Sequence, residues 1–104
     1  MDELKEEIRQ WTIDMDWEQF HTPENLAKSI SIEAGELLEC FQWNDNYDEE
    51  DVCDELADVA TYCIMMADAI DVDLEEIIRK KLEKNKAKYP ADKFRGISTK
   101  YNKL

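Results

Sequence analysis

The chain has 104 residues, a formal net charge of −13, and only two glycines and two prolines. This length is that of a single domain, here residues 1–104, whose core is thin if the chain stays alone. So little glycine and proline excludes a glycine-rich phosphate-binding loop, argues against a many-turned β fold and predicts an all-α protein. The negative charge argues against nucleic acid as a partner, because such binding needs Lys and Arg to neutralise phosphates.

Four helices are predicted in chain order, and most of them have recognisable ends. The first spans residues 2 to about 14, with acidic residues in its first turn that suit the helix dipole, and its expected role is packing. The others run from about Pro23 to Trp43, from Asp48 to about Asp68, and from Asp73 to the Tyr89-Pro90 pair. The predicted N-terminal caps are Thr22 with Pro23 at the first helical position, Asp48, and Asp73 with Glu76 as an acidic capping box.

Two carboxylate pairs share the same spacing, Glu33 with Glu36 and Glu55 with Asp58. Residues three apart lie on one face of a helix, so each pair can point both carboxylates in one direction. Two helices joined by a short loop run antiparallel and bring the pairs opposite each other. The sequence therefore predicts four negative charges in one small volume, which favours a bound cation.

The position of Glu33 strengthens this interpretation. It falls within an apolar stripe of the second helix, formed by Leu26, Ile30, Ala34, Leu37 and Phe41. An ionised carboxylate facing a core is costly unless it is paired or binds a metal. Glu55 and Asp58 flank the apolar seam predicted on the third helix, which consists of Val52, Leu56, Val59, Cys63, Met66 and Ile70. Acids solvated on the surface of an acidic protein are the alternative, and that alternative leaves Glu33 unexplained.

Charge is spread unevenly along the chain. Residues 79–104 hold ten basic against two acidic residues, for +8, whereas residues 1–78 carry −21. A basic end beside an acidic cluster suits a small polyanion that binds together with divalent cations. Lys81, Asn85 and Lys88 share one face of the fourth helix and can hold phosphate oxygens, although a solvated lysine surface is the alternative. The basic tail from about 91 to 104 has little apolar material of its own, and its order is expected to depend partly on a partner or ligand.

Aromatic residues precede the second helix. Trp17 and His21 lie in the segment DWEQFH, outside a regular core pattern. They can close the end of a helical bundle, or line a pocket for a flat ring by stacking and hydrogen bonding.

No apolar run approaches the roughly 20 residues needed to cross a bilayer, and the run DELKEEIRQ lacks the character of a signal peptide. We therefore expect a soluble, cytoplasmic protein without a membrane partner. The cysteines are odd in number and widely spaced, which predicts reduced thiols used in packing. They are Cys40, Cys53 and Cys63.

The runs EAGELLECFQW, DELADVATYCIMMAD and KLEKNKAKYP resemble the MazG-like nucleotide pyrophosphohydrolases of the all-α NTP pyrophosphatase superfamily. That family has ExxE on one helix and ExxD on the next, which this chain meets with its two carboxylate pairs. The preceding run DWEQFHTPENL is similar to the single-domain branch that contains dCTP pyrophosphatases. The resemblance extends from about Asp16 to Lys103.

This resemblance implies an antiparallel bundle of about four helices, completed as a homodimer or homotetramer. It implies Mg²⁺-dependent hydrolysis of a nucleoside triphosphate to the monophosphate and pyrophosphate, with Mn²⁺ as a possible substitute for Mg²⁺. A pyrimidine deoxynucleotide such as dCTP is the favoured substrate by resemblance to that branch. Removal of surplus or modified nucleotides, a sanitising role, follows only by analogy.

The family's site roles carry over to matching positions of this chain. The implied metal ligands are Glu33, Glu36, Glu55 and Asp58. Glu36 is also the expected residue that orients or deprotonates the attacking water, although a ligand and a base are not separable from the sequence. The residues implied around the base are Trp17, His21, Trp43 and Tyr62. Those implied at the triphosphate are Lys81, Asn85, Lys88 and Arg95. Residues from two subunits can complete such a pocket.

Three other interpretations stay open. A di-iron carboxylate bundle needs Glu-x-x-His on two helices, and this chain offers only Glu18 with His21. A non-enzymatic acidic interaction module explains the charge and the helices but not the position of Glu33. A triphosphate-binding sensor with little turnover fits the same residues as the enzyme.

Overall fold

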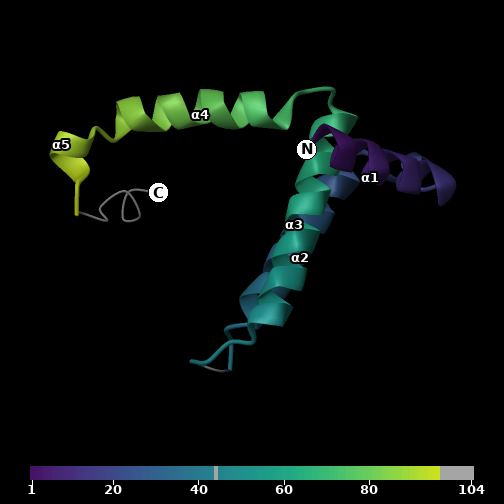
Figure 1. Cartoon of the computed structure of the whole chain (residues 1–104), viewed down its shortest axis with the longest axis horizontal. Coiled ribbons are helices and arrows are strands. Elements are labelled where there is room, and N and C mark those ends of the chain that lie inside the picture. The colour runs from purple at the N-terminus through teal and green to yellow at the C-terminus, as the bar shows by residue number, and fades with distance from the viewer. Residues whose placement is uncertain (44, 97–104) are drawn as a thin grey trace. The chain divides into compact units, whose positions relative to one another are not determined.

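The computed structural model describes residues 1–43 and 45–96, and Figure 1 shows its helices. They are α1 (Asp2–Asp14), the 3-10 helix η1 (Glu18–Phe20), α2 (Pro23–Glu39), α3 (Glu49–Ala69), α4 (Leu74–Lys88) and α5 (Ala91–Phe94). The part of the chain so described contains no strand, which confirms the all-α prediction. Contacts divide the chain into two compact units, Met1–Val72 and Asp73–Leu104. The single domain over residues 1–104 stays a prediction.

The predicted helix starts are confirmed by their capping bonds. Thr22 Oγ1 accepts from the Asn25 backbone N–H at 3.2 Å and starts α2. Asp48 Oδ1 accepts from the Glu50 N–H at 2.9 Å, and Asp73 Oδ1 accepts from the Glu76 N–H at 3.0 Å. Each bond satisfies a backbone donor that has no partner within its own helix. Local chemistry therefore fixes where α2, α3 and α4 begin.

The end of α2 was predicted wrongly. The helix stops at Glu39 rather than at Trp43. Beyond Glu39 the backbone hydrogen bonds join residues three apart, as in a 3-10 turn; the Phe41 N–H, for example, donates to the Leu38 carbonyl at 3.0 Å. The chain then turns, and Phe41 packs against Tyr47 with ring centroids 5.0 Å apart.

A left-handed residue redirects the chain between α1 and η1. Asp16 has φ 55°, and the following Trp17 N–H donates to the Thr12 carbonyl at 3.0 Å, which closes the end of α1. Asp tolerates this conformation better than most residues with a side chain. The turn sets the Trp17 ring edge-on against Trp11, with centroids 4.9 Å apart. The aromatic segment is thus anchored to α1.

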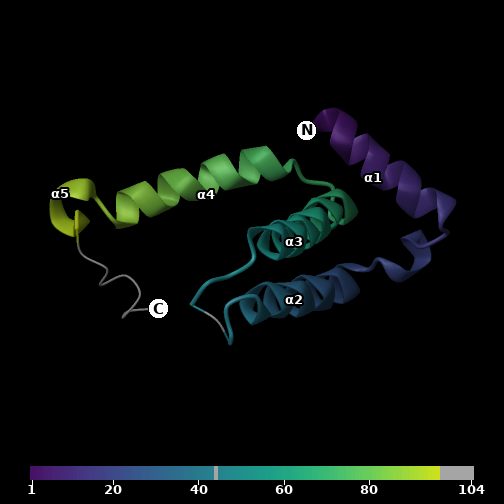
Figure 2. The same cartoon turned by 60° about the horizontal axis from the view of Figure 1, so that its bottom comes forward.

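Helices α2 and α3 run antiparallel and side by side, as both Figure 1 and Figure 2 show. Helix α3 also packs against α1. The most deeply buried apolar side chain of the first unit is Leu26 on α2, with 1% of its surface exposed. The other buried apolar side chains of the described residues all lie on α3, and they are Ile64, Met65 and Ala67.

The predicted apolar seam of α3 was partly wrong. Leu56 and Ile70 are 54% and 48% exposed, whereas three residues outside the seam are buried. The reason is that the C-terminal half of α3 is covered by α1 as well as by α2, so residues on more than one face are enclosed. In the predicted stripe of the second helix, Ala34 on α2 and Phe41 beyond its end are exposed, and Glu33 on α2 is half-buried.

The second unit contains α4 and α5 among its described residues. Helix α4 ends at Lys88, as predicted from Tyr89-Pro90. The short helix α5 was not predicted; its start is fixed by the Pro90 carbonyl, which accepts from the Phe94 N–H at 3.1 Å. Tyr89 and Phe94 pack edge to face across this turn, with centroids 5.2 Å apart. Residues 97–104 of the predicted basic tail lie outside the described residues.

Candidate metal centre and active site

Four acidic side chains, here called the acid cluster, meet between α2 and α3. Glu33, Glu55 and Asp58 each place one carboxylate oxygen within 4.8 Å of the others. Glu36, one turn beyond Glu33 on α2, lies close enough to Glu33 and Glu55 to raise the pKa of both carboxyls. Glu33 and Glu36 lie on α2, and Glu55 and Asp58 lie on α3. The antiparallel packing of these two helices therefore brings together all the residues expected to bind metal.

In the part of the chain that the structure describes, no basic side chain forms an ion pair with the acid cluster. Among the described residues, Glu33 Oε2 and Glu55 Oε2 are buried and have no hydrogen-bond partner. Hydrogen bonding with Glu36, then burial, then repulsion from the neighbouring carboxylates raise the pKa of Glu33 to about 7. Burial, followed by hydrogen bonding with Glu36, raises the pKa of Glu55. Protons or a cation must compensate so much negative charge in a partly desolvated space.

These residues fit a divalent cation. Mg²⁺ prefers oxygen ligands at about 2.1 Å, so two oxygens bound to one ion lie no more than about 4.2 Å apart. The observed spread of up to 4.8 Å is within side-chain adjustment of that limit. The two buried oxygens without partners are the strongest sign of fit, because a cation would satisfy both.

The residues expected around the base lie in three places. Trp17 and His21 lie together, with ring centroids 6.4 Å apart, just before α2 begins. Trp43 follows the other end of α2 and is 83% exposed. Because α2 has 17 residues, it is about 25 Å long, and one chain cannot bring Trp43 to the same base as Trp17. Tyr62 is half-buried on α3, one turn beyond Asp58.

A cavity of about 290 Å³ lies between α1, η1 and α3, and His21 is one of its walls. Its apolar lining includes Ile8, Met65 and Ala69. Sequence reasoning gave α1 only a packing role and missed this cavity. A signal was present, because residues 1–78 hold only three basic residues and two of them, Lys5 and Arg9, line the cavity one turn apart on α1.

The cavity and the acid cluster share one face of α3. Asp58, Tyr62, Met65 and Ala69 follow each other at intervals of four, three and four residues, which keeps them on one side of the helix. Met65 is about 10 Å along the helix axis from Asp58. This separation is comparable to the reach of a nucleoside from its 5′-phosphate to its base.

The residues expected at the triphosphate lie in the second unit. Lys81, Asn85 and Lys88 are exposed on α4, and Arg95 is exposed at the end of α5. Lys88 Nζ lies 5.4 Å from the Tyr89 ring centroid. Their role in phosphate binding stays a prediction.

The helical hairpin sets Glu-x-x-Glu of α2 against Glu-x-x-Asp of α3 over a shared space, which is the arrangement of a divalent-metal site. Residues 28–104 match the MazG-like family, and the chain belongs to that family. Over its whole length it is 31% identical to mouse and 32% identical to human dCTP pyrophosphatase 1, and it covers 67% of each of these proteins. The expected family is thereby confirmed, and an enzyme is favoured over a non-enzymatic interaction module.

A solved structure supports the same assignment. The chain resembles the crystal structure of a pyrophosphatase from Archaeoglobus fulgidus DSM 4304, with a TM-score of 0.78 and 41% sequence identity. The match covers 86% of this chain and 92% of the archaeal one. Among the described residues, no helix is both long and apolar enough to span a membrane.

We expect the acid cluster to make stability depend on both pH and metal. The pKa of Glu33 rises from an ordinary 4.5 to about 7 on folding, so its contribution to stability is complete below pH 4.5 and is lost as the pH rises through 7. The melting temperature of metal-free protein should therefore fall between pH 5 and pH 8, and Mg²⁺ should restore it at pH 8.

Glu33→Gln should flatten this pH profile and remove the response to Mg²⁺ in the same thermal melts. Glu39→Gln is the matched control, because Glu39 is exposed on the same helix. Identical profiles for wild-type protein and Glu33→Gln would show that the acid cluster does not control stability in this way.

Proposed function

We propose that this pyrophosphatase hydrolyses a pyrimidine deoxynucleoside triphosphate, dCTP foremost, to the monophosphate and pyrophosphate, with Mg²⁺ held by the acid cluster. The observation that carries the proposal is the pair of buried, unpartnered oxygens of Glu33 and Glu55. The dCTP pyrophosphatase relatives support the choice of base. Mn²⁺ accepts the same oxygen ligands and should substitute for Mg²⁺.

The chemistry follows from the position of each acid. A bound divalent ion neutralises charge on the phosphates and lowers the pKa of a nearby water. Glu33, Glu55 and Asp58 would hold the ion. Glu36 is exposed at the edge of the acid cluster, next to Glu33 and Glu55, where it can orient the attacking water and accept its proton. Water oxygen bonds to the α-phosphorus, the bond from this phosphorus to the bridging oxygen breaks, and pyrophosphate leaves.

The base occupies the cavity beside His21. A nucleotide whose α-phosphate lies at the acid cluster reaches the cavity along the face of α3 that carries Tyr62 and Met65. Met65 and Ile8 supply apolar contact for a flat ring, and Trp17 packs against both His21 and α1. The candidates for contact with the phosphates beyond the α-phosphate are Lys81, Asn85, Lys88 and Arg95; the Lys and Arg side chains carry the positive charge, and the Asn85 amide can donate hydrogen bonds.

A second copy of the chain completes the site. Trp43 lies too far along α2 to contact the base held by its own chain, and it is exposed. Large apolar side chains are also exposed along the hairpin, including Ile32, Leu38 and Leu56. Burying them between copies in a homodimer or homotetramer would remove apolar surface from water and bring Trp43 of a second copy to the base.

The activity is tested with a panel of nucleoside triphosphates, scored for monophosphate, pyrophosphate and inorganic phosphate. We expect pyrophosphate release that requires Mg²⁺ and is fastest with dCTP. Glu55→Gln should lower kcat at least a hundredfold while the helical circular dichroism is kept, whereas Glu39→Gln should leave turnover within about twofold. Release of inorganic phosphate alone, or turnover that persists in a chelator, would contradict the proposal.

The shared site is tested by mixing two inactive variants. Glu55→Gln removes a metal ligand, and Trp43→Ala removes the base contact that a second copy provides. Mixed oligomers then contain one site with both residues intact, so the mixture should turn over dCTP faster than the two variants measured separately. Activity equal to the sum of the separate variants, together with a monomeric mass by light scattering, would show that each chain works alone.

A further inference from the structure

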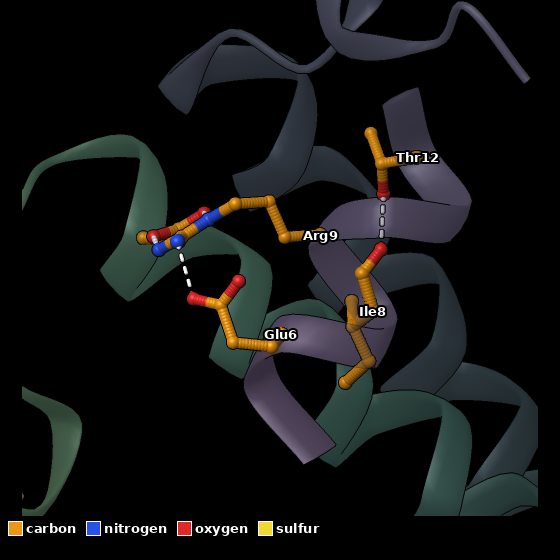
Figure 3. Close-up of polar contacts among 5 residues, drawn as sticks. Glu6, Ile8, Arg9 and Thr12 are labelled. Atoms are coloured by element: carbon orange, nitrogen blue, oxygen red, sulfur yellow. Dashed lines mark hydrogen bonds and ion pairs between the residues drawn. The ribbon is translucent and has the colours of Figure 1, made fainter. Parts of the chain in front are cut away.

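The cavity beside His21 has an ion pair in its wall. Arg9 on α1 donates from Nε to Asp68 Oδ2 at 3.1 Å and from Nη2 to Asp68 Oδ1 at 2.5 Å. Its third contact runs from Nη1 to Glu6 Oε1 at 2.5 Å (Figure 3). Arg9 and Asp68 both line the cavity. A two-pronged ion pair of this kind fixes the direction of the carboxylate as well as its charge.

Asp68 remains an acceptor with unused capacity. Its hydrogen bonds to Arg9, together with the charges of Arg9 and Lys5, lower the pKa of this carboxyl, so it is ionised at neutral pH. A carboxylate has about four lone-pair positions and no donor, and Arg9 occupies two of them. The Asp68 side chain is 33% exposed, which leaves it accessible from the cavity.

Two other polar groups of the cavity, Thr12 and Glu18, are less suited to recognise the edge of a ring. Thr12 donates its hydroxyl to the Ile8 carbonyl at 2.9 Å, so its proton is already used within α1 (Figure 3). Glu18 is exposed on η1 and has water as a competing partner. Lys5 and Arg9 balance Glu18 and Asp68 in charge, so the wall suits a neutral ring that carries both donors and acceptors.

We propose that Asp68, held in place by Arg9, accepts a hydrogen bond from the exocyclic amino group of the base and selects cytosine over uracil and thymine. This inference rests on the proposed function, because it requires the base to lie in the cavity. Cytosine presents an amino donor at the position where uracil and thymine present a carbonyl acceptor. A carbonyl facing Asp68 would place two acceptors against each other with no donor between them. Mismatches of this kind make polar sites selective.

The position of Asp68 along α3 agrees with this role. It lies ten residues beyond Asp58, which is about 15 Å along the helix axis, at the far end of the cavity from the acid cluster. Met65 lies between the two, one turn before Asp68, and can contact the face of the ring. The edge of the base, rather than its sugar, is therefore the part of the ligand that meets Asp68.

The test is the affinity of the full chain for dCMP and for dUMP, measured by titration calorimetry. Wild-type protein should bind dCMP at least tenfold more tightly than dUMP. Asp68→Asn keeps the shape of the side chain but adds a donor, so it should reduce this preference at least tenfold, mainly by improving binding of dUMP. The ratio of kcat/KM for dCTP to that for dUTP should change in the same direction.

Two further variants separate recognition from simple anchoring of α1. Glu6→Gln is the matched control: it removes a contact to the same Arg9 but leaves the pair with Asp68, so the preference should be unchanged. Arg9→Lys keeps the charge but loses the two-pronged geometry, and it should weaken the preference, which also covers the case in which Asp68→Asn fails to fold.

The possible results are distinct. If Asp68 only anchors α1, its variants weaken dCMP and dUMP equally and the ratio stays constant, which overturns the inference. Equal binding of the two monophosphates by wild-type protein, or no binding of either, overturns it as well. A wild-type protein that prefers dCMP but hydrolyses no triphosphate would refute the proposed function while leaving the base preference in place.

Discussion

Mutual repulsion among the carboxylates of the acid cluster is the constraint on which the rest of this structure depends. Packing of α2 against α3 holds Glu33 and Glu55 where water cannot satisfy all of their oxygens. A protein at neutral pH tolerates such a group only by taking up protons or by binding a cation. The same repulsion therefore limits the stability of the hairpin and favours metal binding. A substitution that removes a carboxylate from the acid cluster should stabilise the metal-free protein and weaken its binding of metal.

Features governed by neighbouring residues could be predicted from the sequence. Each predicted cap, such as Asp48 at α3, forms its bond, and the two carboxylate pairs meet because their spacing and a short turn require it. The end of α2 and the buried face of α3 could not be predicted, because they depend on which helices pack on which sides. The cavity was missed for the same reason, since Arg9 and Asp68 are 59 residues apart in sequence and meet only when α1 docks on α3.

Helix α3 carries residues of both the acid cluster and the cavity, and its length sets the distance between them. Glu55 and Asp58 lie toward its start, where the acid cluster forms, and Asp68 lies near its end, in the cavity wall. Membership of the MazG-like family accounts for the first part, since it establishes a nucleotide pyrophosphatase. The proposed choice of base depends on the second part, where α1 contributes Arg9. Hydrolysis and base selection are therefore expected to respond to different substitutions.

The most direct measurement is to locate the metal itself. Crystals of the full chain grown with Mn²⁺ and measured at the manganese absorption edge should give an anomalous peak between α2 and α3, coordinated by Glu33, Glu55 and Asp58. Glu33→Gln crystals grown in the same way should lose or weaken that peak. A manganese ion bound elsewhere, with these three carboxylates left without any ion, would contradict the central claim.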